Sequence, residues 1–141
     1  MPCVNGKPGR AGDWLAQAGN DFEWATSSFR EGHFAQTCFV CQQVAEKALK
    51  ALALLRGYEA VRGHSVTEIA KALDINDEIL NAGRRLDQYY ITARYPDAVP
   101  SGAPFELFTR DQAKEALGFA ERVLIRVRQA FTDEQKRNPG S

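Results

Sequence analysis

Apolar residues recur every three or four positions through most of this chain, and that spacing constrains the fold more than any other feature. Three segments show it clearly, at Trp14, Ala18, Phe22, Ala25 and Phe29; at Cys41, Ala45, Ala48, Leu52 and Leu55; and at Ala113, Ala116, Ala120, Val123, Val127 and Phe131. Such spacing places the side chains on one stripe of an α-helix, which can then pack against a core. No segment alternates apolar and polar residues as a half-buried strand does. The sequence therefore predicts an all-α fold.

Residues that start or end helices divide the chain into four long helices and one short helix. The first two long helices are predicted over residues 13–30 and 34–56, because Gly32 and Gly57 follow them and glycine readily takes the left-handed conformation that ends a helix. Ser65 and Glu68 have the spacing of a capping box, which predicts a short helix from there to about residue 73. Pro96 ends the next long helix, because the residue before a proline is driven out of the helical conformation.

The two remaining long helices complete the predicted architecture. The fourth helix in the chain is expected to start at Asp74 or Asn76 and to turn four residues inward, Ile79, Leu86, Tyr90 and Ala93. Thr109 and Gln112 form a second capping box, which predicts a last helix to about residue 131. Short connections favour antiparallel neighbours, so we expect an up-and-down four-helix bundle with a short extra helix. The bundle spans residues 13–131, with flexible tails at 1–12 and 132–141, and its core includes Phe22, Ala45, Leu52, Leu86, Ala120 and Val127.

Charge, hydropathy and cysteine content exclude several classes of protein. The 18 basic and 18 acidic side chains cancel, so a broad basic surface for nucleic acid is not expected, and any such contact must be local. No apolar run approaches the roughly 20 residues that cross a membrane, and the first residues lack the apolar segment of a secretory signal. Three cysteines, an odd count, predict a reducing cytoplasm. Cys38 and Cys41 are expected to pack in the core, with no metal site and no cofactor.

Two polar features suggest a binding surface, and each has two interpretations. On the second helix, Gln43, Glu46, Lys47 and Lys50 share a face, which is either a solvated face with a Glu46–Lys50 ion pair or the wall of a polar groove. His64 precedes the capping Ser65. It is either a loop residue that covers the helix start or a polar group held at a helix N-terminus, where backbone N–H groups favour an anion such as phosphate.

The stretch "TARYPD", residues 92–97, is a third candidate. Asp87, Tyr90 and Arg94 lie nearly on one line of the fourth helix, and Tyr95 and Asp97 stand at its broken end. Arg94 offers a planar fork for phosphate or carboxylate, and Tyr95 offers a ring for stacking. In the alternative, local interpretation, Arg94 binds the last carbonyls of its helix and pairs with Asp97.

Three segments together resemble the HEPN family, namely "FAQTCFVCQQVAEKALKALALLRG", "HSVTEIAKAL" and "LDQYYITARYPDA". Members of this family are small helical bundles, similar to the C-terminal helical domain of kanamycin nucleotidyltransferase. The resemblance implies a homodimer, a link to nucleotides or RNA, and often a separately encoded minimal nucleotidyltransferase as partner in a pair that looks like a toxin–antitoxin module. Its ribonuclease branch uses an Arg followed by a His after four to six residues. Here the permitted positions after Arg94 hold Val99, Pro100 and Ser101, none of which is histidine, so the sequence departs from the ribonuclease branch.

The residues and the resemblance leave three hypotheses. The first is a non-catalytic, dimeric module that binds a nucleotide or a nucleotidyltransferase partner through Arg94, Tyr95 and Asp97, with His64, Glu46 and Lys47 beside them. The second is a metal-independent ribonuclease, which would use Arg94 together with His64. The third is a helical interaction scaffold without a ligand. For the dimer, aromatic residues near one helix end form a candidate apolar patch, at Tyr89, Tyr90, Tyr95, Phe105 and Phe108.

Overall fold

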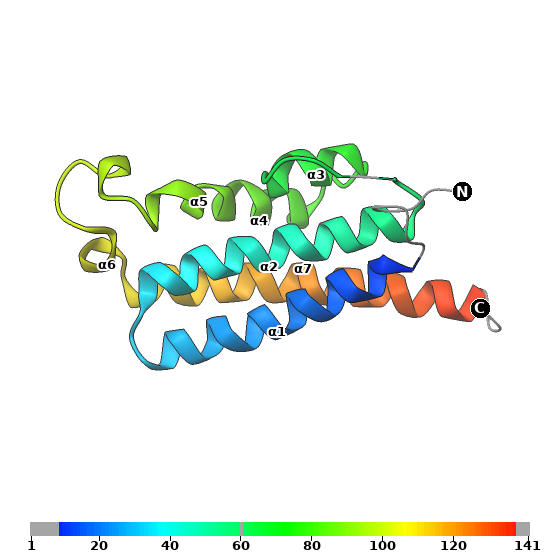
Figure 1. The fold of residues 1–141 in the computed structure, drawn as a ribbon, viewed down its shortest axis with the longest axis horizontal. Coiled ribbons are helices and arrows are strands. Elements are labelled where there is room, and N and C mark those ends of the chain that lie inside the picture. The colour runs from blue at the N-terminus through cyan, green and yellow to red at the C-terminus, as the bar shows by residue number, and fades with distance from the viewer. Residues whose placement is uncertain (1–8, 60, 138–141) are drawn as a thin grey trace.

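The computed structural model describes residues 9–59 and 61–137, and every element in these ranges is helical, as predicted. In chain order the elements are α1 (Arg10–Arg30), α2 (Phe34–Leu55), α3 (Val66–Ala72), α4 (Glu78–Asp87), α5 (Tyr89–Thr92), the 3₁₀ helix η1 (Pro96–Ala98), α6 (Pro104–Leu107) and α7 (Arg110–Arg137). Helices α1, α2, the α4–α5 segment and α7 run alternately in opposite directions along an elongated bundle (Figure 1). Helix α3 is the short extra helix.

Helix α2 is the centre of the bundle and packs against α1, α3, α4, α5, α6 and α7. Its sequence is apolar on nearly all sides, which is typical of a helix enclosed by others. Five of the six predicted core residues are buried, at Ala45, Leu52, Leu86, Ala120 and Val127. The sixth, Phe22, is only partly buried. The buried side of α1 also takes in two polar residues, Asp21 and Ser28, which hydrogen-bond to Lys47 and Thr37 of α2.

The predicted fourth helix is broken into two pieces. Asp77, rather than Asp74 or Asn76, caps α4 by accepting a 3.0 Å hydrogen bond from the Ile79 N–H. Asp74 instead takes a positive φ of 58° in the turn after α3. Helix α4 ends at Asp87, whose carboxylate is bonded to α3, and α5 restarts at Tyr89. Tyr95 then leaves the helical conformation, with φ −118° and ψ 125°, as expected of the residue before Pro96.

The ends of the bundle also differ from the predicted bounds. Helix α1 starts at Arg10 and α7 continues to Arg137, so residues 10–12 and 132–137, predicted as tails, are helical. Gly9 is the N-cap of α1, and residues 1–8 and 138–141 of the predicted tails lie outside the described residues. The predicted capping box of the last helix is confirmed. The Gln112 N–H donates to Thr109 Oγ1 over 3.2 Å, and the Thr109 N–H donates to Gln112 Oε1 over 2.9 Å.

The two cysteines of α2 lie in the core, as predicted. Cys38 and Cys41 are free thiols with no exposed surface. Burial, with a smaller contribution from the Glu115 carboxylate, raises the pKa of Cys38 to about 12. Burial likewise raises the pKa of Cys41 well above its ordinary value. Both side chains therefore stay in the protonated, poorly nucleophilic form.

Protection of these thiols is a testable consequence. A Cys3→Ser variant, which keeps only the two core cysteines, is expected to react with a disulfide reagent at pH 8 at least about 100-fold more slowly when native than when unfolded, because thiolate is the reactive form. The measurement is the rate of thiol release followed by absorbance, with the same variant in guanidinium as control. Rapid reaction of the native variant would place Cys38 or Cys41 at the surface.

Candidate functional site

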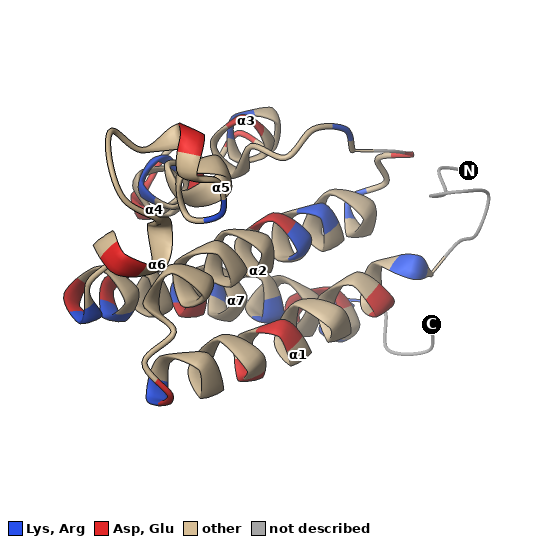
Figure 2. Cartoon of the chain, turned by 60° about the vertical axis from the view of Figure 1, so that its left-hand side comes forward, with Lys and Arg blue, Asp and Glu red and all other residues tan. Residues whose placement is uncertain are grey.

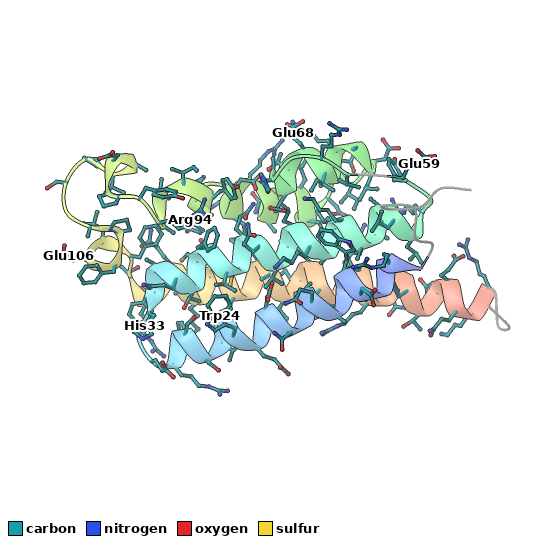
Figure 3. The ribbon with its side chains drawn as sticks, viewed as in Figure 1. Trp24, His33, Glu59, Glu68, Arg94 and Glu106 are labelled. Carbon is teal, nitrogen blue, oxygen red and sulfur yellow. The ribbon has the colours of Figure 1, made fainter. Side chains whose placement is uncertain are left out.

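Arg94 is fixed at the end of the α5 segment by four contacts. Its Nε donates a 2.9 Å hydrogen bond to the Tyr90 carbonyl. Its guanidinium carbon lies 4.3, 4.8 and 4.9 Å from the ring centroids of Phe39, Tyr90 and Tyr95. Figure 3 shows the side chain between α5 and α2. Cation–π contacts with three rings hold the fork in one orientation.

The predicted pair between Arg94 and Asp97 does not form. Asp97 is exposed in η1, and no carboxylate in the described part of the chain lies within ion-pair distance of Arg94. The local interpretation is therefore half right, because Arg94 does bind a carbonyl of its own helix. Its terminal nitrogens keep their donors for another group.

His64 reaches the same aromatic ring as Arg94. Its imidazole stacks on Tyr90, with 5.1 Å between centroids and 16° between planes. The imidazole of His64 and the guanidinium carbon of Arg94 thus lie 5.1 and 4.8 Å from the centroid of the same Tyr90 ring. The imidazole is about 59% exposed, and its Nδ1 lies 3.3 Å from both carboxylate oxygens of Glu46. His64, in the segment before α3, and Arg94, just after α5, thus form one surface.

Glu46 belongs to a buried polar ridge of α2, formed by Gln42, Glu46 and Lys50. Glu46 and Lys50 are only 4% and 8% exposed, and the Lys50 ammonium donates to Glu46 over 3.0 Å. The predicted Glu46–Lys50 ion pair therefore forms, but it is buried and does not lie on a solvated face. Lys50 also lies 5.6 Å from the Trp14 ring centroid. A carboxylate with little access to water is available to orient His64.

Lys47, in contrast, does not join this surface. Its ammonium binds Asp21 of α1 at 2.5 Å, and Gln17 donates to the same carboxylate. Since Lys47 and Glu46 are neighbours in a helix, they point in different directions. The structure brings four of the six predicted site residues to one surface, namely Arg94, Tyr95, His64 and Glu46, and leaves out Lys47 and Asp97.

The N-terminus of α3 already holds an anion, the carboxylate of Asp87. It accepts hydrogen bonds from the Val66 and Thr67 N–H groups at 2.8 and 2.9 Å and from the Ser65 hydroxyl at 2.9 Å. The proposed role of His64 in binding an external anion at this helix start is therefore filled from within the chain. Ser65 itself accepts from the Glu68 N–H at 3.1 Å, which confirms the predicted cap.

Gln42 was not predicted as a site residue, although its side chain hydrogen-bonds both to Asp87 and to the backbone of His64. Its amide donates to Asp87 at 3.2 Å and to the His64 carbonyl at 2.6 Å, and its oxygen accepts from Gln43 at 2.7 Å. Gln43 continues to Glu46 at 3.4 Å. The available signal in the sequence was the spacing of Gln42, four residues before Glu46 and eight before Lys50, on one side of an otherwise apolar helix.

The predicted aromatic patch divides into buried and exposed members. Tyr89 is buried and meets Phe108 edge to face, with 5.5 Å between centroids. Tyr95 and Phe105 remain 50% and 69% exposed, and Ile91 and Leu107 are also exposed. These four residues belong to the α5–α6 end of the bundle (Figure 1).

Charge elsewhere is mixed. Basic and acidic residues are interspersed along α1, α2 and α7 (Figure 2).

Within the described ranges, no three His, Cys, Asp or Glu side chains are grouped as metal ligands would be. In the same ranges, no helix is long and apolar enough to span a membrane.

Comparison with known proteins supports one family. The model of the HEPN domain matches residues 11–130. A Methanocaldococcus jannaschii protein named "Putative toxin MJ1304" is 28% identical over 124 residues, covering 79% of this chain and 81% of that protein.

Solved structures give the same result. TT1696 from Thermus thermophilus is 40% identical with a TM-score of 0.81, over 85% of this chain and 97% of that one. The archaeal HEPN homologue ST0689 is 35% identical with a TM-score of 0.73, over 86% and 97%. An HEPN domain protein of Thermotoga maritima is 27% identical with a TM-score of 0.68, over 85% and 98%.

Proposed function

This chain belongs to the HEPN domain family, and on that premise we propose that it is a non-catalytic module that binds a nucleotide through Arg94. The observation that carries the proposal is a guanidinium held over three rings without a carboxylate partner in the described residues. An arginine fork suits phosphate, and a fork already held in place loses less entropy on binding. Because the net charge is zero, this local group, rather than a broad field, attracts the anion.

The same surface has groups for the rest of a nucleotide. Tyr95 is half exposed beside Arg94 and provides a face on which a base can stack. His64 is exposed on the other side of the site and is held by Glu46 and Tyr90. Arg94 thus binds phosphate, Tyr95 stacks on the base, and His64 provides a second polar contact.

The proposal extends to partners. The M. jannaschii relative carries the name of a toxin, and we propose that this chain also acts in a toxin–antitoxin-like pair with a separately encoded minimal nucleotidyltransferase. It does so as a homodimer, for which the exposed Ile91, Phe105 and Leu107 are the apolar surface. In such a pair, an acidic residue of the partner could take the place of the phosphate at Arg94.

The test is the effect of Arg94 on nucleotide affinity. Arg94→Ala is expected to weaken binding of ATP or GTP by about 1.5–3 kcal/mol, the range for hydrogen bonds to charged groups, or roughly 10- to 150-fold. Arg94→Lys should recover only part of this, since it keeps the charge and loses the fork. Affinities are measured by titration calorimetry over a panel of nucleotides.

Arg84→Ala is the matched control, because Arg84 is exposed on the neighbouring α4. It should bind as the unaltered protein does. If Arg94→Ala instead lowers the melting temperature and leaves every affinity unchanged, Arg94 is only a brace for the helix end.

A metal-independent ribonuclease is the second candidate, favoured by the contact of both Arg94 and His64 with Tyr90. Glu46 holds Nδ1 of His64, an arrangement that orients a general base or acid, while Arg94 would neutralise the phosphate. This candidate requires RNA cleavage by the purified protein in EDTA and its loss in His64→Ala. A protein that binds nucleotides and does not cleave RNA fits the first proposal.

A further inference from the structure

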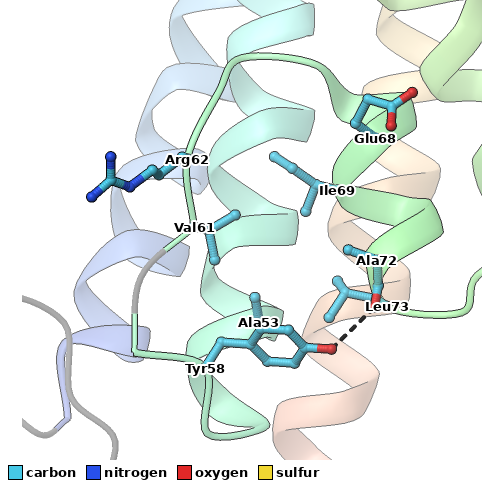
Figure 4. Close-up of a pocket in the computed structure, with 8 residues that line it drawn as sticks. All are labelled: Ala53, Tyr58, Val61, Arg62, Glu68, Ile69, Ala72 and Leu73. Carbon is cyan, nitrogen blue, oxygen red and sulfur yellow. Dashed lines mark hydrogen bonds between the residues drawn. The ribbon is translucent and has the colours of Figure 1, made fainter.

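A pocket lies between α3, the end of α2 and the segment after α2. Its volume is about 210 Å³. Its walls are mostly apolar, formed by Ala53, Tyr58, Val61, Ile69, Ala72 and Leu73. Figure 4 shows Val61 and Ile69 facing each other above Ala53. None of these residues takes part in the Arg94 surface.

Two hydrogen bonds join the segments that form the walls of this pocket. The Tyr58 hydroxyl donates to the Ala72 carbonyl over 3.0 Å (Figure 4). Arg56 donates from Nη1 to the Leu73 carbonyl, also over 3.0 Å. Both acceptors are at the C-terminal end of α3, where carbonyls have no partner within the helix. The end of α2 is thereby tied to the end of α3, and the pocket between them is part of the fold.

The mouth of the pocket carries one positive and one negative side chain. Arg62 and Glu68 line it and are exposed on opposite sides of the opening (Figure 4). Arg62 has no ion pair within the described residues, and the one ion pair of Glu68 is a 3.8 Å contact with exposed Lys71. The Arg62 guanidinium and the Glu68 carboxylate both point away from the middle of the pocket in Figure 4, so binding needs a rotation of each of these two solvated side chains.

We propose that this pocket binds a free α-amino acid with an aliphatic side chain. The side chain fills the apolar pocket, Arg62 binds the α-carboxylate, and Glu68 binds the α-ammonium group. Size supports this choice, since pockets for drug-sized ligands or nucleotides usually measure about 300–1,000 Å³. Opposite charges on two sides of an apolar pocket match a zwitterion that carries an aliphatic group. A purely apolar ligand would leave both charges unused.

The test is a titration of the full chain with L-leucine, followed through the NMR signals of the Val61, Ile69 and Leu73 methyl groups. L-leucine should shift these signals saturably, and L-aspartate should not. Arg62→Ala should weaken binding about tenfold or more, because it removes a charged hydrogen-bond donor. Ala72→Leu should abolish binding by filling the pocket from its wall, and it is expected to fold because Ala72 is exposed. Arg84→Ala should bind normally.

Two ligand analogues test the role of each charge. Leucinamide lacks the carboxylate and 4-methylpentanoate lacks the ammonium group, so both should bind at least tenfold more weakly than leucine. Equal binding of 4-methylpentanoate would overturn the assignment of an amino acid in favour of an aliphatic carboxylate. Absence of saturable shifts with leucine, or shifts that persist in Ala72→Leu, would overturn the site itself. Neither result bears on Arg94, because nucleotide affinity is measured separately.

Discussion

Replacing Glu46 with alanine should destabilise the fold by about 3–5 kcal/mol, the usual cost of removing one partner of a buried ion pair. Lys50 would keep its charge in a site where it is only 8% exposed, near the Trp14 ring and without its carboxylate partner. His64 and Gln43 would lose their common acceptor as well. The measurement is the free energy of unfolding from urea melts.

A double variant makes this expectation sharper. Replacing both Glu46 and Lys50, as in Glu46→Leu with Lys50→Met, should recover most of the lost stability, because a well-packed apolar pair of similar volume is often as stable as a buried ion pair. Glu121→Ala, at an exposed position of α7, is the control and should change stability by less than about 0.5 kcal/mol. A loss below about 1 kcal/mol in Glu46→Ala would show that water reaches the pair.

The buried ridge also explains a limit of sequence-based prediction. Helical periodicity was enough to predict α2, since its apolar stripes are wide. The same periodicity placed Glu46 and Lys50 with Gln43 and Lys47 on one polar face, although α3 and α1 cover different parts of that face. Burial of a charged residue depends on which helices pack against it, and local spacing does not record this. Phe22 was misplaced for the same reason, because the buried stripe of α1 runs through Ala18, Asp21, Ala25 and Ser28.

The site itself could be predicted only in part. Arg94 and Tyr95 could be selected because Pro96 places them at a helix end, and His64 because it precedes a capping box. Their meeting at Tyr90 depends on the packing of the α4–α5 segment beside the start of α3, which short-range patterns do not specify. Asp87 was noted for its alignment with Tyr90 and Arg94. Its role as the anion at α3 was missed, since the cap comes from a residue about 20 positions later.

Asp87→Ala should therefore have the second largest effect on stability after Glu46→Ala, a loss of about 3 kcal/mol in the free energy of unfolding. One carboxylate accepts from Ser65, Val66, Thr67 and Gln42. Hydrogen bonds to a charged acceptor contribute about 1.5–3 kcal/mol each but are not additive, and donors near the surface regain water. Removal of the carboxylate also takes negative charge from the N-terminus of α3, where the helix dipole favours it.

The Asp87→Asn variant should have a stability between those of the unaltered protein and the alanine variant, because an amide has only one oxygen that accepts hydrogen bonds. Oδ1 of Asp87 accepts from Val66 and Gln42, and Oδ2 accepts from Ser65 and Thr67. An amide nitrogen in place of either oxygen would face a backbone donor. Ser65 can adapt, because a hydroxyl can accept as well as donate, whereas the backbone N–H groups of Val66 and Thr67 cannot. We expect a loss of about half that of the alanine variant on these grounds.

Amide hydrogen exchange can separate a local effect at α3 from a general loss of stability. In Asp87→Ala the amides of α3 should exchange faster than those of α2, because the helix loses the cap that joins it to α4. Asp97→Ala is the control, since Asp97 is exposed and has no polar partner among the described residues. His64 directly precedes Ser65, so loosening of this helix start should also weaken nucleotide binding. Unchanged exchange of the Val66 and Thr67 amides would mean that Asp87 is not what holds α3 in place.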